Sequence, residues 1–577
     1  MPGAERVASG GRMRKFSVGD RKRLSYDGAI CKPYITWRAQ APRYKVAVMT
    51  FDLLIQGGTV VDGTGRPGVA ADVGVSGGRI AALAAGLEGD AAVNIDAGGR
   101  IVAPGFIDAH THSDFTLLSA PGADSKVRQG ITTEVVGNCG FSPAPVAPET
   151  LDLLKEYVGF LNADLPWNWQ RLGEYYQRVS DQGCAMNMVP LVGHGAIRIA
   201  VMGFADRAPS ASELVHMQRL VGEAMDDGAF GLSSGLIYTP GCYGDTAELV
   251  ALAQVSQRAG GVYATHMRGE GGTLEEAISE ALTIGEQAGI RVQISHLKAS
   301  GRENWGKMER ALHMIEAGRE RGIDVSADIY PYIAGSTTMT SLFPAWTLEG
   351  GMDRFLVRIA DPDTRRRIID EVQGDGEGWS RATGSLGWGD ILVASCQREK
   401  QFEGCTVAQI ADAMGKEPPE AMMDFLLAEQ GRAAVVLFMM SEDNVARGIA
   451  HPLLMIGSDS LALATGQGGK PHPRTYGTFP RVLGKYVREE RLLSLEEGVR
   501  KMTSMAADTF GLSDRGVLAE GKAADIAIFD PETVADRASF DEPHQYSTGI
   551  DYVIVNGQVV VDHGVQHPVL PGQVLRK

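Results

Sequence analysis

The segment IVAPGFIDAHTH, residues 101–112, is a nearly continuous apolar run that ends in two histidines. An apolar run without polar alternation is typical of a strand that is buried on both faces. His110 and His112 are two residues apart, so their side chains point to the same side of an extended chain. The segment therefore predicts a buried strand whose carboxyl end presents two imidazoles together.

Seven further apolar runs follow, and helical segments alternate with them. We place the eight expected strands at 101–109, 132–136, 186–192, 229–233, 262–265, 291–295, 324–329 and 453–457. This alternation indicates a parallel sheet with helices outside, and eight such units predict an α/β fold of the (β/α)8, TIM-like barrel type.

One connection, before the eighth strand, is unusually long. It contains a mostly helical, charged insertion at about 346–450, with helices expected at 354–372, 408–414 and 419–429. Loops at the carboxyl ends of barrel strands build active sites. We therefore interpret the insertion as a lid or a substrate-shaping segment.

Both ends of the chain contain short β-strand-type segments that are separated by turn sequences. Strands are expected at 51–55, 59–62, 72–75, 79–83, 525–529, 552–555 and 558–562. Gly57-Gly58, Gly77-Gly78 and Asn556-Gly557 are hairpin-type turn sequences. Neither end is long enough to bury a sheet face alone. The sequence therefore predicts a small β-sandwich domain from residues 49–103 and 515–577, and a barrel domain from residues 104–514.

Charge is unevenly distributed along the 577 residues. Residues 1–48 hold eleven Lys and Arg against three Asp and Glu, and the rest holds 44 against 68, so the net charges are +8 and −24. An acidic body argues against nucleic acid as a partner. Because Met49 opens a sequence typical of a natural start, we expect residues 1–48 to be a disordered or wrongly annotated extension.

Apolar runs, the N-terminal sequence and the cysteine content indicate the cellular compartment of the protein. No apolar run approaches the roughly 20 residues that span a bilayer, and no secretory signal is visible. Six cysteines are too few for a disulfide framework and favour a reducing cytoplasm. We expect a cytoplasmic protein that binds no membrane. The sequence is silent on oligomeric state.

Metal-binding residue types recur directly after five of the expected strands. His110 and His112 follow the first strand, and Cys139, His266, His296 and Asp459 follow four others. The carboxyl ends of barrel strands meet at one mouth. A single His or Cys is most often structural, but this combination of imidazole, thiolate and carboxylate predicts a zinc site.

Several motifs together resemble one family. Segments 104–114, 137–142, 233–238, 265–268 and 296–298 resemble the amidohydrolase superfamily and, within it, the D-aminoacylase (N-acyl-D-amino-acid deacylase) group. Segments 516–529 and 553–562 resemble the composite β-sandwich of that superfamily. The resemblance covers roughly residues 51–345 and 450–565.

The resemblance implies a role for each matching residue. Cys139, His266 and His296 would hold one tightly bound zinc ion. His110 and His112, together with Cys139 and Asp459, would form a second site that is weaker or vacant. Asp459 would be the general base and acid. Lys298, Tyr238 and Arg474 would bind the carboxylate of the substrate.

We call the three residues Lys298, Tyr238 and Arg474 the carboxylate clamp. The sequence around each of them also allows a structural role. Lys298 lies two positions after His296 and would face the same cavity on a continued strand, or it could be a surface lysine that pairs with the acidic insertion. Arg474 could cap a loop, and Tyr238 could pack beneath it. Tyr330 could line the acyl side or belong to the core, and Ser336 is a weaker candidate for a substrate hydrogen bond.

Three functions are compatible with these residues. We expect zinc-dependent hydrolysis of a small-molecule substrate, an N-acyl-D-amino acid. The same machinery could act on a cyclic amide or a dipeptide, as in hydantoinases and dihydroorotases. A non-catalytic scaffold is disfavoured because every ligand is retained. A serine hydrolase is disfavoured because the G-x-S-x-G letters at 231–235 do not precede a helix start.

Overall fold

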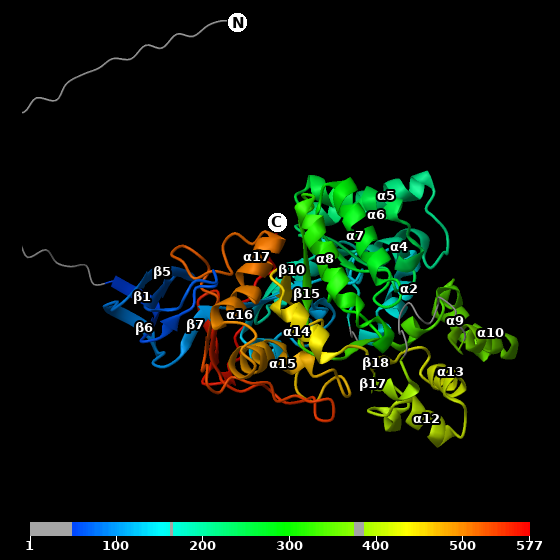
Figure 1. Ribbon diagram of the computed structural model, residues 1–577. Coiled ribbons are helices and arrows are strands. Elements are labelled where there is room, and N and C mark those ends of the chain that lie inside the picture. The colour runs from blue at the N-terminus through cyan, green and yellow to red at the C-terminus, as the bar shows by residue number, and fades with distance from the viewer. Residues whose placement is uncertain (1–48, 162–164, 374–385) are drawn as a thin grey trace, which may run out of the picture. The chain divides into compact units, whose positions relative to one another are not determined.

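Eight parallel strands form the centre of the computed structural model, which describes residues 49–161, 165–373 and 386–577 (Figure 1). These strands are β8 (Phe106–Asp108), β9 (Ile131–Val136), β10 (Asn187–Pro190) with β11 (Val192–Gly193), β12 (Gly231–Gly235), β13 (Val262–His266), β14 (Arg291–Ile294), β15 (Val325–Ile329) and β19 (Leu454–Ile456). Neighbouring strands pair in parallel in two sheets, one in the order β8, β9, β10 and the other in the order β11, β12, β13, β14, β15, β19. The expectation for residues 1–48 lies outside the described residues.

The last strand lies beside the first. A parallel bridge joins Thr111 to Ser460, and the backbone N–H of Asp459 donates to the carbonyl of His110 at 2.8 Å. The chain thus has the predicted α/β barrel, and its seam brings the tails of β8 and β19 together.

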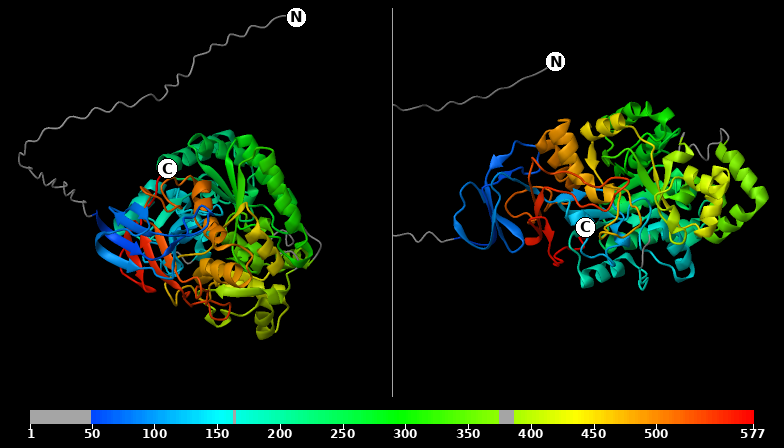
Figure 2. Two further views of the ribbon diagram at one scale, coloured as in Figure 1. Left: turned by 60° about the vertical axis from the view of Figure 1, so that its left-hand side comes forward. Right: turned by 90° about the horizontal axis from the view of Figure 1, so that it is seen from below.

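Helices surround these strands (Figure 2). They include α1 (Asp124–Val127), α2 (Leu151–Tyr157), α3 (Leu172–Gln182), α4 (His194–Met202), α5 (Ala211–Asp226), α6 (Thr246–Arg258), α7 (Leu274–Ala288), α8 (Lys307–Glu320), α14 (Glu442–Ala450), α15 (Arg474–Arg481), α16 (Leu495–Lys501) and α17 (Ser504–Phe510). In α7, Leu274, Ile278, Ala281 and Leu282 are buried. This spacing of three and four residues produces one apolar face that packs toward the strands.

Strands from both chain ends pair in the second β region. One sheet has the order β5 (Arg79–Ala84), β4 (Asp72–Ser76), β1 (Met49–Gln56), β6 (Gly89–Asp96). The other has the order β23 (Val565–Gln566), β22 (Gln558–Asp562), β21 (Ile550–Val555), β20 (Ile526–Phe529), β7 (Ile101–Pro104), β2 (Thr59–Val60), β3 (Val69–Ala70). Apolar residues of both ends, such as Val75, Val102 and Ile526, share one buried cluster. On this basis we propose that residues 49–103 and 515–577 together form one domain, and that residues 104–514 form the barrel domain.

Two details differ from the sequence expectations. The run 101–109 is not one strand, because β7 belongs to the terminal sheet and β8 to the barrel. Between them, a Cβ at Gly105 would lie 2.2 Å from the side chain of Thr132. Gly57-Gly58 connects strands of different sheets and is no hairpin. Asn556-Gly557 does turn a hairpin, with φ of 49° and 82°.

The insertion contains a sheet that the sequence did not predict. Its helices are α9 (Met352–Ala360), α10 (Pro362–Gln373), α12 (Val407–Met414) and α13 (Pro418–Ala428), near the expected positions. Antiparallel strands β16 (Gly335–Thr338), β18 (Ala434–Leu437) and β17 (Ile391–Ser395) accompany them. In Figure 1 this part lies opposite the terminal sheets. Within the described ranges, no helix is long and apolar enough to cross a membrane.

Candidate active site

The six candidate metal-binding residues named from the sequence lie together at the carboxyl ends of the barrel strands. Each of them is at most 9% exposed. Their ligand atoms form two groups within 4.8 Å, namely His110, His112, Cys139 and Asp459, and Cys139, His266 and His296. Cys139 belongs to both groups, as the resemblance implied.

Cys139 is the centre of this cluster. Its Sγ atom lies 3.2 Å from His110 Nε2, 3.6 Å from His266 Nδ1 and 3.5 Å from His296 Nε2. His112 Nε2 lies 3.2 Å from Asp459 Oδ1. A buried thiol that faces three imidazoles has the donor set of a zinc site.

The protonation states also fit metal binding. Burial holds the pKa values of His266 and His296 well below the usual range, so both imidazoles are neutral and free to donate a lone pair. Burial raises the pKa of the Cys139 thiol well above its usual value. Metal binding therefore has to displace the thiol proton.

Three cluster residues have left-handed backbone conformations. The φ angles are 55° at Cys139, 35° at His296 and 50° at Asp459. Non-glycine residues rarely adopt such angles, and such strain concentrates at functional sites. Strand periodicity alone gives no sign of these turns, which direct the three side chains into the mouth.

Two buried carboxylates that the sequence analysis missed orient the histidines. Asp328 Oδ2 lies 3.4 Å from His110 Nδ1, and Asp328 Oδ1 accepts the backbone N–H of His296 at 3.0 Å. Glu270 Oε1 lies 3.0 Å from His296 Nδ1. A charged residue inside the apolar run 324–329 was the available signal for Asp328.

We expect Asp328→Asn to weaken zinc binding about 10- to 100-fold, because partners of ligating histidines fix ring orientation and raise ligand basicity. Competition with a chelator measures the loss. Asp324→Asn is the matched control, since Asp324 lies just before the same strand but pairs at the surface with Arg291 and Arg319. Equal affinity of the two variants would contradict the role of Asp328.

A second buried network supports the seam between β8 and β19. Lys126 Nζ lies 3.0 Å from Asp108 Oδ2, 2.9 Å from Glu134 Oε1 and 2.8 Å from Ser458 Oγ. The backbone N–H of Ser458 donates to Asp108 Oδ1 at 2.7 Å. These contacts tie the residues before His110 to the residue before Asp459. Sequence reasoning did not identify this network.

The structure places the candidate substrate residues beside the cluster. Lys298 is 4% exposed, so it is not a surface lysine. Its Nζ atom lies 2.6 Å from Glu270 Oε1 and 2.7 Å from His296 Nδ1. The bond to Glu270 uses one of its three donors. His296 Nδ1 carries its own proton toward Glu270 when Nε2 faces the metal group, so Lys298 keeps donors for a ligand oxygen.

Arg474 joins the base candidate to the insertion. Its Nη1 atom lies 2.9 Å from Asp459 Oδ2, and its Nη2 donates to the carbonyl of Ser336 at 3.2 Å. Although burial opposes the charge of Asp459, Arg474 and the neighbouring histidines hold the pKa of this carboxyl well below its usual value. The guanidinium also lies 4.7 Å from the centre of the Tyr330 ring.

Three cavities meet at Tyr238, whose hydroxyl lies 2.9 Å from that of Thr337. The lysine cavity, of about 30 Å³, is lined by Lys298, Tyr330, Ser336 and both histidines of the Cys139–His266–His296 group. The large cavity, of about 240 Å³, is lined by His112, Asp459 and Arg474 among others. The aromatic cavity, of about 50 Å³, is lined by Tyr157, Phe204 and Phe343 among others.

His194, the first residue of α4 after β11, contacts residues outside the metal-binding cluster. It forms a buried pair with Glu248 at 2.7 Å, and Glu248 also binds Arg198. It is not among the lining residues of the three cavities. These contacts favour a structural role.

Fold and site together define an α/β barrel with a histidine–cysteine–aspartate metal centre at the mouth. The chain belongs to the amidohydrolase family, whose model matches residues 94–561. An N-acyl-D-glutamate deacylase of Alcaligenes xylosoxydans xylosoxydans is 38% identical over 528 residues, which are 91% of this chain and 96% of the relative. A D-aminoacylase of the same organism is 38% identical over 514 residues, or 88% and 94%.

One solved structure adds the metal and a reaction mimic. It is an N-acyl-D-glutamate deacylase from Bordetella bronchiseptica, complexed with zinc and a phosphonate inhibitor that mimics the tetrahedral intermediate. It matches with a TM-score of 0.78 and 36% identity, over 92% of this chain and 100% of that chain. This similarity confirms the barrel fold expected from the sequence.

Proposed function

We propose that this chain is a zinc-dependent deacylase that hydrolyses the amide bond of N-acyl-D-amino acids, releasing a carboxylate and a free D-amino acid. The observation that carries the proposal is the buried Cys139–His266–His296 group, whose two histidines line one cavity together with Asp459 and Lys298. The similarity of the chain to two N-acyl-D-glutamate deacylases and a D-aminoacylase also supports it.

In this proposal Cys139, His266 and His296 hold one tightly bound zinc ion. His110 and His112, with Cys139 and Asp459, offer a second and weaker site. A bound zinc ion supplies a Lewis acid and lowers the pKa of water to about 7. Asp459 takes the proton of the attacking water and returns it to the leaving nitrogen.

Lys298, Tyr238 and Arg474 bind the α-carboxylate, with Tyr330 and Ser336 beside them. All five line the lysine cavity or the large cavity. A free carboxylate among these cations makes charge-assisted hydrogen bonds, which are about twice as strong as neutral ones.

We expect Lys298→Met to lower kcat/KM for an N-acetyl-D-amino acid about 10- to 100-fold, since a hydrogen bond to a charged group contributes about 1.5–3 kcal/mol. The corresponding N-acetyl-D-amino-acid amide, which lacks the carboxylate, should lose much less. Steady-state kinetics on both substrates tests this. Lys307→Met is the control, because Lys307 pairs with Glu275 away from the cavity. An equal loss on acid and amide would contradict the clamp.

The direct test is free-amine release from paired N-acetyl-D- and N-acetyl-L-amino acids by the zinc-loaded protein. Release from the D series alone supports the proposal. Release from neither series, with zinc present, would indicate a cyclic amide or an acyl group that the insertion selects, and a lack of release from longer N-acyl-D-amino acids as well would overturn the proposal in favour of the cyclic amide.

We also propose a cytoplasmic location. Among the described residues, Cys139, Cys184, Cys242, Cys396 and Cys405 are all unpaired. Unpaired thiols are typical of reducing compartments.

A further inference from the structure

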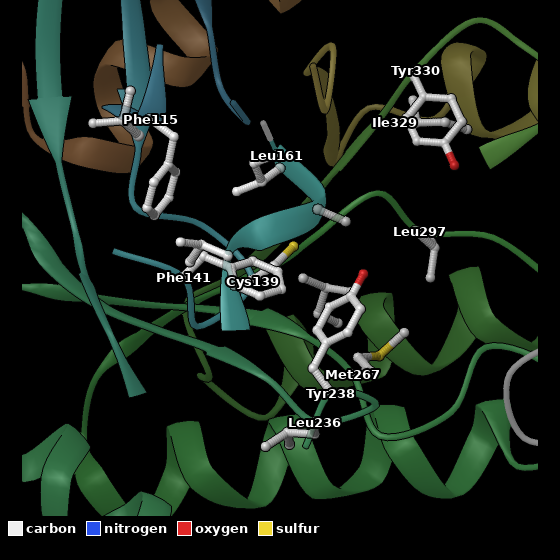
Figure 3. Close-up of a cluster of buried hydrophobic side chains, with 14 of the residues drawn as sticks. Phe115, Cys139, Phe141, Leu161, Leu236, Tyr238, Met267, Leu297, Ile329 and Tyr330 are labelled. Atoms are coloured by element: carbon white, nitrogen blue, oxygen red, sulfur yellow. The ribbon is translucent and has the colours of Figure 1, made fainter. Parts of the chain in front are cut away.

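The three cavities differ in which of the candidate metal-binding residues line them or lie beside them. Phe141 and Tyr238, with ring centres 4.9 Å apart, line both the large and the aromatic cavity and stand between them. Figure 3 shows these two rings beside Cys139. The Phe141 ring also lies 5.8 Å from that of His112, and the Tyr238 ring 5.0 Å from that of His266. The two rings that separate the large cavity from the aromatic cavity therefore also contact two of the candidate metal-binding histidines.

An N-acyl-D-amino acid has three arms around its amide, namely the α-carboxylate, the side chain and the acyl chain. The lysine cavity holds Lys298 and is the smallest, at about 30 Å³, so it suits the carboxylate. The aromatic cavity shares Ile237, Tyr238 and Ser341 with the lysine cavity, and the large cavity shares Tyr238, Ser336, Thr337 and Asp459 with it. Both cavities are therefore neighbours of the carboxylate, and the metal-binding residues distinguish them. The side chain is attached to the α-carbon and not to the carbon that is attacked, so it suits the aromatic cavity, which no metal-binding residue lines.

The large cavity then remains for the acyl chain. Two members of the metal-binding group, His112 and Asp459, line it directly, whereas neither lines the aromatic cavity. The acyl chain is attached to the carbon that is attacked, so it extends from the metal centre. A cavity that opens on the ligands is therefore its natural place.

Size and charge indicate which acyl group fits. An apolar cavity of about 150 Å³ accommodates benzene, and the large cavity has about 240 Å³, so an acetyl methyl group would leave most of it empty. Its charged lining residues have other partners. Arg474 pairs with Asp459 at 2.9 Å and bonds the carbonyl of Ser336, which lines both this cavity and the lysine cavity, so its remaining charge faces the α-carboxylate of the proposed clamp. His472 bonds the carbonyl of Ala334. The rest of the lining is uncharged and mixed, since Leu161, Leu461 and Leu463 add apolar surface and residues such as Ser119 and Gln467 add neutral polar groups.

We propose that the large cavity is an acyl subsite, and that it selects uncharged acyl groups longer than acetyl, such as phenylacetyl or a chain of about six to eight carbons. This inference rests on the proposed deacylase function and deepens it. The insertion contributes to the subsite, because Ala394 of β17 and Ala434 of β18 line the large cavity.

The test compares N-acetyl-, N-hexanoyl- and N-phenylacetyl-D-methionine with the zinc-loaded full chain. We expect kcat/KM to be at least tenfold higher for the two longer acyl groups than for acetyl. Ala434→Phe, which fills the large cavity, should lower the hexanoyl-to-acetyl ratio at least tenfold. Leu461→Ala, which enlarges the cavity, should shift the optimum to a longer chain and provides a second readout if the first variant does not fold.

Ala345→Phe is the matched control, since Ala345 lines the aromatic cavity instead. It should leave the hexanoyl-to-acetyl ratio unchanged and lower the preference for N-acetyl-D-methionine over N-acetyl-D-alanine. If Ala434→Phe lowers that side-chain preference and spares the acyl ratio, the two arms are exchanged and the inference fails. Hydrolysis of the acetyl substrate with no acyl preference overturns the inference alone. Hydrolysis of no N-acyl-D-amino acid overturns the proposed function as well.

Discussion

We expect Cys139→Ala to lose both zinc and activity. The Cys139 sulfur belongs to both ligand groups, so its removal takes a ligand from the tight site and from the weaker one. Zinc contributes several kcal/mol of transition-state stabilisation, and each 1.36 kcal/mol is a factor of ten. We therefore expect kcat to fall by about a thousandfold or more. Elemental analysis of the purified variant, together with amine release, measures both losses.

Cys184→Ala is the control for this variant. Cys184 is equally buried, but its thiol donates to the carbonyl of Met186 at 3.0 Å and belongs to neither ligand group. It should keep full zinc content and near-normal turnover. Full zinc occupancy in Cys139→Ala would remove Cys139 from the ligand set.

The second large effect separates catalysis from metal binding. We expect Asp459→Asn to keep the tightly bound zinc, because Cys139, His266 and His296 form a group without Asp459. An amide cannot accept the proton of the attacking water, so kcat should fall about 10²- to 10⁴-fold, the usual contribution of a general base. Zinc content and steady-state kinetics are measured on the same preparation.

The matched control for that variant is Asp536→Asn. Asp536 also pairs with an arginine, Arg481, at 3.0 Å, but it lines none of the three cavities. Its kcat should change less than twofold. An Asp459→Asn enzyme with a near-normal rate would show that the base is another residue.

Much of the fold was predictable because barrel strands carry a local signature. Strands such as β9 and β12 are buried at every residue, and burial on both faces produces the apolar runs read in the sequence. The split of 101–109 was not predictable from hydrophobicity, since both halves are buried and only Gly105 marks the change of sheet. The insertion sheet was missed because its strands, β16, β17 and β18, are short and far apart in the sequence.

The residue types of the candidate site were also visible locally. A histidine, cysteine or aspartate directly after a buried strand is a property of that segment alone, and barrel topology brings such segments to one mouth. The sequence by itself therefore determined the barrel, its metal-binding residue types and, through the resemblance, the class of reaction.

Tertiary structure decided the contacts between these segments. It showed that Lys298 is buried against Glu270, that Asp328 contacts His110, and that three cavities meet at Tyr238. His112 and Asp459 lie 3.2 Å apart although 347 positions separate them in the chain. That distance follows from the closure of the barrel between its first and last strands, because neither segment alone specifies where the other will lie.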